Sequence, residues 1–112
     1  MTRNQEHAVR SIIALLAQGE YQAVASMTGS KRLTAAELRT AVEEYGRTLV
    51  IPPGGLPPDI EEIEDQEDPH VLYLVVDMWT AEQGRSDLSL ELTLTENRLG
   101  LIDVAIDNLH MM

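Results

Sequence analysis

The amino-acid sequence predicts a single α+β domain over residues 1–112, with N-terminal helices packed on one face of a curved antiparallel sheet of about four strands. Two patterns predict this class. Residues 87–96 read DLSLELTLTE, in which leucines alternate strictly with polar residues, as in a strand with one buried and one solvated face. Residues 1–46 instead carry apolar side chains at helical spacing. A chain of 112 residues is long enough for one domain and short for two.

Three helices are expected before the sheet. The first runs from about Asn4 to Gln18, and a shorter one covers Glu20 to Met27, because apolar residues recur there on one helical face. Thr34 begins the third helix with a capping box, since Glu37 lies three residues further on. Gly46 is placed to end that helix.

Four strands are expected, at residues 47–51, 70–79, 87–96 and 101–109. Matching the alternating patterns pairs Leu74 with Leu92, and Leu94 with Ile102. One face of the sheet then carries the apolar residues that the helices cover: Leu72, Leu74, Val76, Met78, Leu88, Leu90, Leu92, Leu94, Ile102, Val104 and Ile106. The opposite, open face carries Tyr73, Val75, Asp77, Trp79, Ser89, Glu91, Thr93, Asp103 and Asp107.

The net charge of −11 is unevenly distributed along the chain. Residues 1–58 hold six basic and five acidic side chains, whereas residues 59–112 hold two basic and fourteen acidic ones. An acidic half disfavours nucleic acid, because phosphates repel it, and favours a basic protein partner or simply solubility. The absence of cysteine and of a long apolar segment leads us to expect a cytoplasmic protein that does not associate with membranes.

Two acidic regions are candidate contact surfaces for such a partner. One is the segment DIEEIEDQED, residues 59–68, which has seven acids and no base and is either a solvated loop or an arm that enters a basic cleft. The other is the open face of the sheet, which is either an ordinary solvated face or a docking surface with two aromatic anchors and acids that are not neutralised within the sheet. The candidate partner-binding residues are Asp59, Glu61, Glu62, Glu64, Asp65, Glu67, Asp68, Tyr73, Asp77, Trp79, Glu91, Asp103 and Asp107.

Catalytic and metal-binding patterns are weak by comparison. The acids of the open face, with Tyr45 or His110, are candidates for acid–base chemistry, but such chemistry needs burial of one of them and they look exposed. The three histidines have no metal-ligand spacing, no GxSxG nucleophile motif is present, and Arg85 is expected to pair with its neighbour Asp87. We therefore expect no catalytic residue, metal or cofactor.

The layout resembles the nuclear-transport-factor-like or cystatin-like α+β folds. The resemblance rests on the helical run LLAQGEYQAVASM, a capped third helix ending in YG, the strand pair WTAEQGRSDLSLELTL and the closing strand IDNLHMM, which also look like those of small uncharacterised bacterial proteins. It implies a superfamily that includes isomerases and dehydratases with a pocket between helix and sheet. The same superfamily includes non-enzymatic adaptors and bacterial immunity proteins.

These observations lead to one expected function and two alternatives. We expect a small acidic protein-binding module, most concretely an immunity-type inhibitor that occludes a basic, nuclease-like toxin by charge complementarity. The first alternative is a small-ligand-binding or enzymatic pocket protein of the cystatin-like fold, in which Tyr21, Tyr45 and His110 supply the polar groups. The second is a structural or oligomerising module, and the sequence leaves the oligomeric state open.

Overall fold

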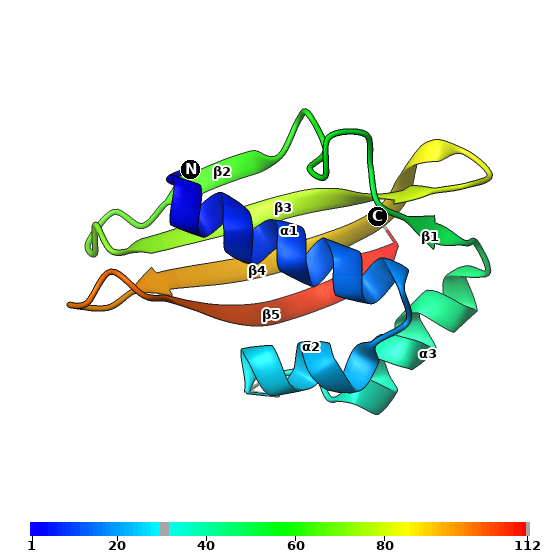
Figure 1. Ribbon diagram of the computed structural model, residues 1–112, viewed down its shortest axis with the longest axis horizontal. Helices are drawn as coiled ribbons and strands as arrows, with labels where there is room; N and C mark the ends of the chain where they lie inside the picture. The colour runs from blue at the N-terminus through cyan, green and yellow to red at the C-terminus, as the bar shows by residue number, and fades with distance from the viewer. Residues whose placement is uncertain (30–31, 112) are drawn as a thin grey trace.

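The computed structural model describes residues 1–29 and 32–111, in which three helices precede an open five-stranded antiparallel sheet (Figure 1). The α+β class and the order of helices and strands are as predicted. The helices lie on one face of the sheet, with α1 crossing it obliquely. The elements are α1 (Arg3–Ala17), α2 (Tyr21–Thr28), α3 (Ala35–Tyr45), β1 (Leu49–Val50), β2 (Glu61–Glu64), β3 (Val71–Thr80), β4 (Gly84–Glu96) and β5 (Ile102–Met111).

The helix ends follow from local chemistry. Thr34 and Glu37 form the predicted capping box, in which each side chain accepts a hydrogen bond from the other residue's backbone amide. Gly46 ends α3 with a φ of 75°, a left-handed conformation that glycine adopts without a steric penalty. A second capping box, between Thr2 and Gln5, begins α1 about one residue earlier than predicted.

The sheet has the order β1-β3-β4-β5, and β2 pairs with β3 as well. β1 and β2 share one edge of β3: β1 pairs with Trp79 and Thr80, and β2 pairs with residues 72–75. β4 is therefore flanked by β3 and β5 along most of its length. β2 and β5 lie at opposite edges of the sheet.

The interpretation of residues 59–68 as a loop or a free arm is wrong for its middle part. Residues 61–64 form β2, which raises the number of strands to five. Their side chains are all exposed, so no alternation of buried and solvated residues marks this strand in the sequence. β2 belongs to the sheet because its backbone pairs with β3, and this pairing does not require an alternation of apolar and polar side chains in the sequence.

The predicted register is correct for one hairpin and wrong for the other. Leu74 pairs with Leu92, as expected, but Leu94 pairs with Val104 and not with Ile102. The turn is longer than predicted, because the Asn97 side chain accepts hydrogen bonds from the amides of residues 99 and 101 and closes a five-residue connection. A slip of two residues keeps every side chain on its face, so the burial pattern does not reveal it.

The hydrophobic core lies between the helices and the β3–β4–β5 face. Ten of the eleven predicted core residues of the sheet are buried, Ile102 being partly exposed, and Leu109 joins them. The helices contribute Val9, Ile12, Ile13, Leu16, Val24 and Leu38. Aliphatic side chains thus fill the space between the helices and the sheet.

Truncation of the leucine row of β4 tests this arrangement. Leu92 is 1% exposed at the centre of the sheet, so Leu92→Ala should lower the free energy of unfolding by about 2–5 kcal/mol in urea denaturation. Leu99 in the β4–β5 turn is 83% exposed, and Leu99→Ala should change it by less than about 0.5 kcal/mol. Similar effects of the two substitutions would contradict the predicted burial.

Candidate functional site

Arg85 forms ion pairs with two of the acids that the sequence assigns to the contact surface. Its Nε donates to Asp77 Oδ2 at 2.9 Å, and its Nη1 pairs with Asp59, which lies just before β2. The expectation that Arg85 pairs with Asp87 is therefore wrong. Arg85 stands beside Trp79 in the β3–β4 ladder, and this places its guanidinium on the open face between Asp77 and the segment before β2.

The other acids of the open face also have partners close by. His110 Nε2 lies 2.6 Å from Glu91 Oε2, and Arg32 Nε lies 3.2 Å from Asp107 Oδ1. Asp107 is the extra residue of a bulge in β5, which brings it to the hydroxyl of Thr93. The expectation that the acids of this face are not neutralised is thus wrong for Asp77 and Asp107, which contact arginine side chains, while Glu91 has a hydrogen-bond partner in His110. Asp103 is exposed on β5.

The two aromatic side chains proposed as anchors do not lie together. Tyr73 and Trp79 are six residues apart on β3, which corresponds to roughly 20 Å along a strand. The Trp79 ring is partly buried over Gly84, where an added Cβ would stand 3.6 Å from it. Tyr73 is 38% exposed and donates its hydroxyl hydrogen to Asp65 at 2.8 Å. Only Tyr73 therefore adjoins the acidic segment.

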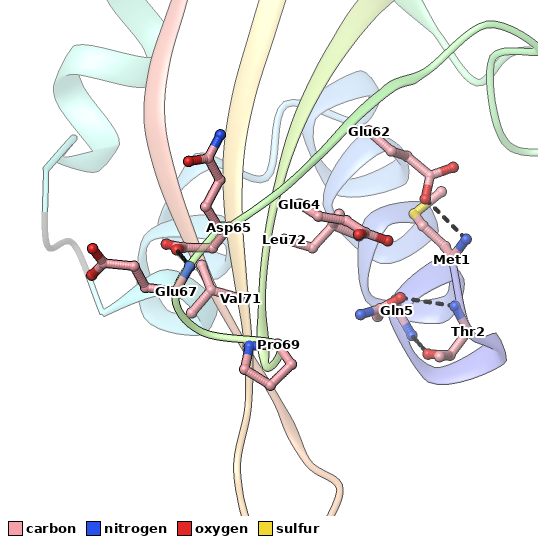
Figure 2. Close-up of a pocket in the computed structure, with 11 residues that line it drawn as sticks. Met1, Thr2, Gln5, Glu62, Glu64, Asp65, Glu67, Pro69, Val71 and Leu72 are labelled. Atoms are coloured by element: carbon pink, nitrogen blue, oxygen red, sulfur yellow. Dashed lines mark hydrogen bonds and ion pairs between the residues drawn. The ribbon is translucent and has the colours of Figure 1, made fainter.

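The acids of β2 project from both sides of the strand. The register sets Glu62 and Glu64 opposite Leu74 and Leu72, on the side of the sheet that the helices cover. In Figure 2 these two carboxylates lie toward the start of α1, where Glu62 accepts a hydrogen bond from the amino group of Met1 at 3.0 Å. Glu61 and Ile63 lie on the open side.

Asp65 fixes the turn between β2 and β3. Its side chain accepts hydrogen bonds from the amides of Glu67, at 2.8 Å, and Asp68, at 3.3 Å, and from the Tyr73 hydroxyl. These bonds stabilise the ionised carboxylate, so the amide of Glu67 and then the hydroxyl of Tyr73 hold the pKa of Asp65 below its usual value. The same contact with Asp65 raises the pKa of Tyr73.

A hollow of about 480 Å³ lies between this turn, β2 and the start of α1 (Figure 2). Glu62, Glu64, Asp65 and Glu67 contribute to its lining. Among the residues that the structure describes, Glu61, Glu64 and Glu67 have no basic side chain within ion-pair distance. We name β2 and the following turn, residues 61–68, the acidic edge.

A second cavity, of about 460 Å³, opens at the end of the sheet beneath α3. Tyr45, Leu88, Leu109 and His110 are among its lining residues. Two of the three residues predicted for a ligand pocket, Tyr45 and His110, thus come together. Tyr21 lines a different hollow, where the guanidinium of Arg39 stands 5.7 Å from the centre of its ring.

The strand register also places three polar residues from three strands side by side, although they are far apart in the sequence. Ser89 of β4 pairs with Asp77 on one side and with His110 on the other, so a carboxylate, a hydroxyl and an imidazole cross three strands. Ser89 was expected on a solvated face, yet it is 0% exposed between these two longer side chains. A nucleophile must reach its substrate, so the buried hydroxyl of Ser89 is unsuited to that role.

Metal-binding clusters and membrane-spanning helices are two further features that bear on candidate sites. Within residues 1–29 and 32–111, no group of three or more histidine, aspartate or glutamate side chains is arranged to hold a metal ion. No helix in these ranges has the length and apolar character needed to cross a membrane.

Comparison with known proteins gives one match of note. A family model described as a domain of unknown function (DUF7668) matches residues 13–112. The match covers most of the chain, which therefore belongs to this family. No curated protein and no solved structure matches the chain.

The Asp65–Tyr73 contact has a measurable effect on titration. In Tyr73→Phe the pKa of Asp65, followed by carboxyl-carbon NMR, should rise, because one hydrogen bond to the ionised form is lost. A carboxyl whose folded pKa lies below its unfolded pKa of about 3.9 stabilises the fold above that pH, and this contribution is lost as pH falls through the folded pKa. The stability difference between wild type and Tyr73→Phe should therefore narrow on acidification below about pH 4. Tyr45→Phe serves as the control, because Tyr45 is at the end of α3 and its hydroxyl bonds to Gln83 and to the amide of Asp87. An unchanged Asp65 pKa in Tyr73→Phe would refute the assignment.

Proposed function

We propose that this member of the DUF7668 family is a small acidic protein-binding module. Its most specific form is an immunity-type inhibitor in the cytoplasm that occludes the phosphate-binding cleft of a basic, nuclease-like toxin. The observation that carries the proposal is the concentration of carboxylates on the acidic edge, three of which have no basic side chain within ion-pair distance among the described residues. Glu61, Glu64 and Glu67 gather on the acidic edge, while Asp77, Glu91 and Asp107 of the open face are paired within the fold.

The clustered carboxylates of the acidic edge indicate how the proposed module would bind its partner. Clustered carboxylates produce a negative potential that steers a basic protein and raises the association rate. Ile63 is 45% exposed and lies opposite Tyr73 in the ladder, so the open side of the acidic edge also offers apolar contact area. Such contacts slow dissociation once the charges have brought the partner into place. The proposed contact surface is thus the acidic edge with Tyr73, and it excludes Trp79.

Nucleic acid is not the proposed partner, because the same carboxylates would repel its phosphates. Asp59 and Asp77 contribute to the surface through their effect on its shape. Arg85 holds both of them, and it thereby ties the segment before β2 to the β3–β4 hairpin. We therefore propose that these two acids position the contact surface rather than contact the partner.

A second candidate function is a small-ligand-binding or enzymatic pocket protein of the cystatin-like fold. The cavity beneath α3 favours it, since Glu44, Tyr45 and His110 bring polar groups to a lining that also contains Leu88 and Leu109. The filled interior between the helices and the sheet favours the first proposal, because it leaves this cavity confined to the end of the sheet.

Charge reversal on the acidic edge tests the first proposal. A basic partner captured from the native host at low salt should bind Glu61→Lys/Glu64→Lys at least tenfold more weakly than wild type, with most of the loss in the association rate. The control Glu20→Lys/Glu43→Lys changes the net charge equally at exposed positions of the helical region and should have a smaller effect. Biolayer interferometry at 50 mM and 500 mM salt measures both.

The difference in partner affinity between the two double variants should be smaller at 500 mM salt than at 50 mM salt, because salt screens the interactions of exposed charges. Equal affinities of the two variants at low salt would contradict the proposed surface.

A further inference from the structure

We propose that the partner supplies an extended basic segment that pairs with the outer edge of β2 as an additional strand. This inference rests on the proposed function and specifies how the acidic edge would make contact. Strand addition combines backbone hydrogen bonds, which give affinity, with alternating side-chain contacts, which give specificity. The acidic edge offers both.

The hydrogen-bonding pattern shows which backbone groups face outward. The amide of Asp65 donates to the carbonyl oxygen of Val71 at 3.3 Å, so this pair continues the β2–β3 ladder as a hydrogen-bonded pair. Hydrogen-bonded and non-hydrogen-bonded pairs alternate along an antiparallel ladder. Glu61 and Ile63 therefore direct their peptide groups toward β3, whereas Glu62 and Glu64 direct theirs away from the sheet.

The outer side of β2 is open. Within residues 1–29 and 32–111, no strand other than β3 pairs with it. Figure 1 shows β2 at the margin of the sheet, with α1 on one face of the sheet and not beyond the edge. The opposite margin differs, because Arg32 of the α2–α3 connection reaches β5 to pair with Asp107.

The side chains of β2 define the chemistry of the incoming segment. Residues directly opposite in neighbouring strands stand with Cβ atoms about 4.5–5.5 Å apart. On the helix side, Glu64 favours a basic side chain on the added strand, and Glu62, whose carboxylate also binds the amino group of Met1, is a second acidic position two residues away. On the open side, the exposed Ile63 favours an apolar side chain at the position opposite it. The fitting segment alternates basic with apolar residues.

The charge of β2 also argues against a second copy of this chain as the strand that pairs with its outer edge. Pairing of two β2 edges would set glutamates against glutamates, and like charges directly opposite are destabilising. Charged edges of this kind prevent self-association. The same charges become attractive when the incoming strand is basic, so one surface serves both purposes.

Two synthetic peptides test the inference on the full chain. The first alternates lysine and valine over nine residues. The second has the same sequence and charge, but carries methyl groups on the backbone nitrogens of two adjacent central residues, which removes one donor from each edge. We expect the first peptide to bind at 50 mM salt, and the methylated peptide to bind at least tenfold more weakly.

A pair of protein variants separates the contribution of the outward backbone N–H of Glu64 to peptide binding from the contribution of its carboxylate charge. Glu64→Gln and Glu64→Pro remove the same carboxylate, but only proline removes the outward N–H, and proline is tolerated at such edge positions. Glu64→Pro should bind the first peptide at least fivefold more weakly than Glu64→Gln does, with both variants folded by circular dichroism. Hydrogen exchange gives an internal control: the peptide should slow exchange at the amides of Glu62 and Glu64 and leave those of Glu61 and Ile63 unchanged.

The outcomes separate this inference from the proposed function. Equal binding of both peptides, with the Gln and Pro variants alike, would overturn strand addition and leave the acidic contact surface intact. Binding of neither peptide at 50 mM salt would overturn both proposals. A dimer of the free protein in sedimentation that is lost in Glu64→Pro would make a second copy the occupant and also overturn the inference.

Discussion

Burial of the leucine row of β4 beneath the helices is the constraint on which the rest of the structure depends. Leu88, Leu90, Leu92 and Leu94 are each at most 1% exposed, and β4 is paired on both sides. Because side chains alternate along a strand, fixing this row also fixes which residues of β3 and β5 face the helices. The acids of β3 and β5 are then assigned to a face by their register with β4, and those of β2 by their register with β3.

The sheet region has few basic residues to pair with its many acids, because residues 59–112 hold two arginines and fourteen acidic side chains. Arg85 and Arg98 are the two basic side chains after residue 58, and Arg85 is taken by Asp59 and Asp77. Arg32 comes from the helical region to Asp107, and His110 stands beside Glu91. Asp77, Glu91 and Asp107 are thus paired on the open face of the sheet. Among the described residues, Glu61, Glu64 and Glu67 of the acidic edge have no basic side chain within ion-pair distance, so the charge of this edge depends on where the bases lie as well as on where the acids lie.

Some of these features can be predicted from sequence patterns, and others cannot. Period-two alternation predicts β3, β4 and β5 because their burial is one-sided, and the capping box of Thr34 predicts the start of α3. β2 is concealed because all four of its side chains are exposed. The β4–β5 register is concealed because Asn97 sets the turn length and a two-residue slip preserves the faces. Ion pairs such as Arg85 with Asp59 join residues 26 positions apart, which no local pattern reveals.

The position of β2 is held although none of its side chains is buried. Pairing with β3 anchors one side of its backbone, and Asp65, bonded to Tyr73 and to two turn amides, anchors its C-terminal end. Arg85 restrains the segment before it through Asp59. An edge held in this way loses little conformational freedom on binding, so a larger share of the contact energy appears as affinity. The contacts that keep this acidic strand ordered without a core beneath it are therefore the same ones that would limit the entropy cost of the proposed strand pairing.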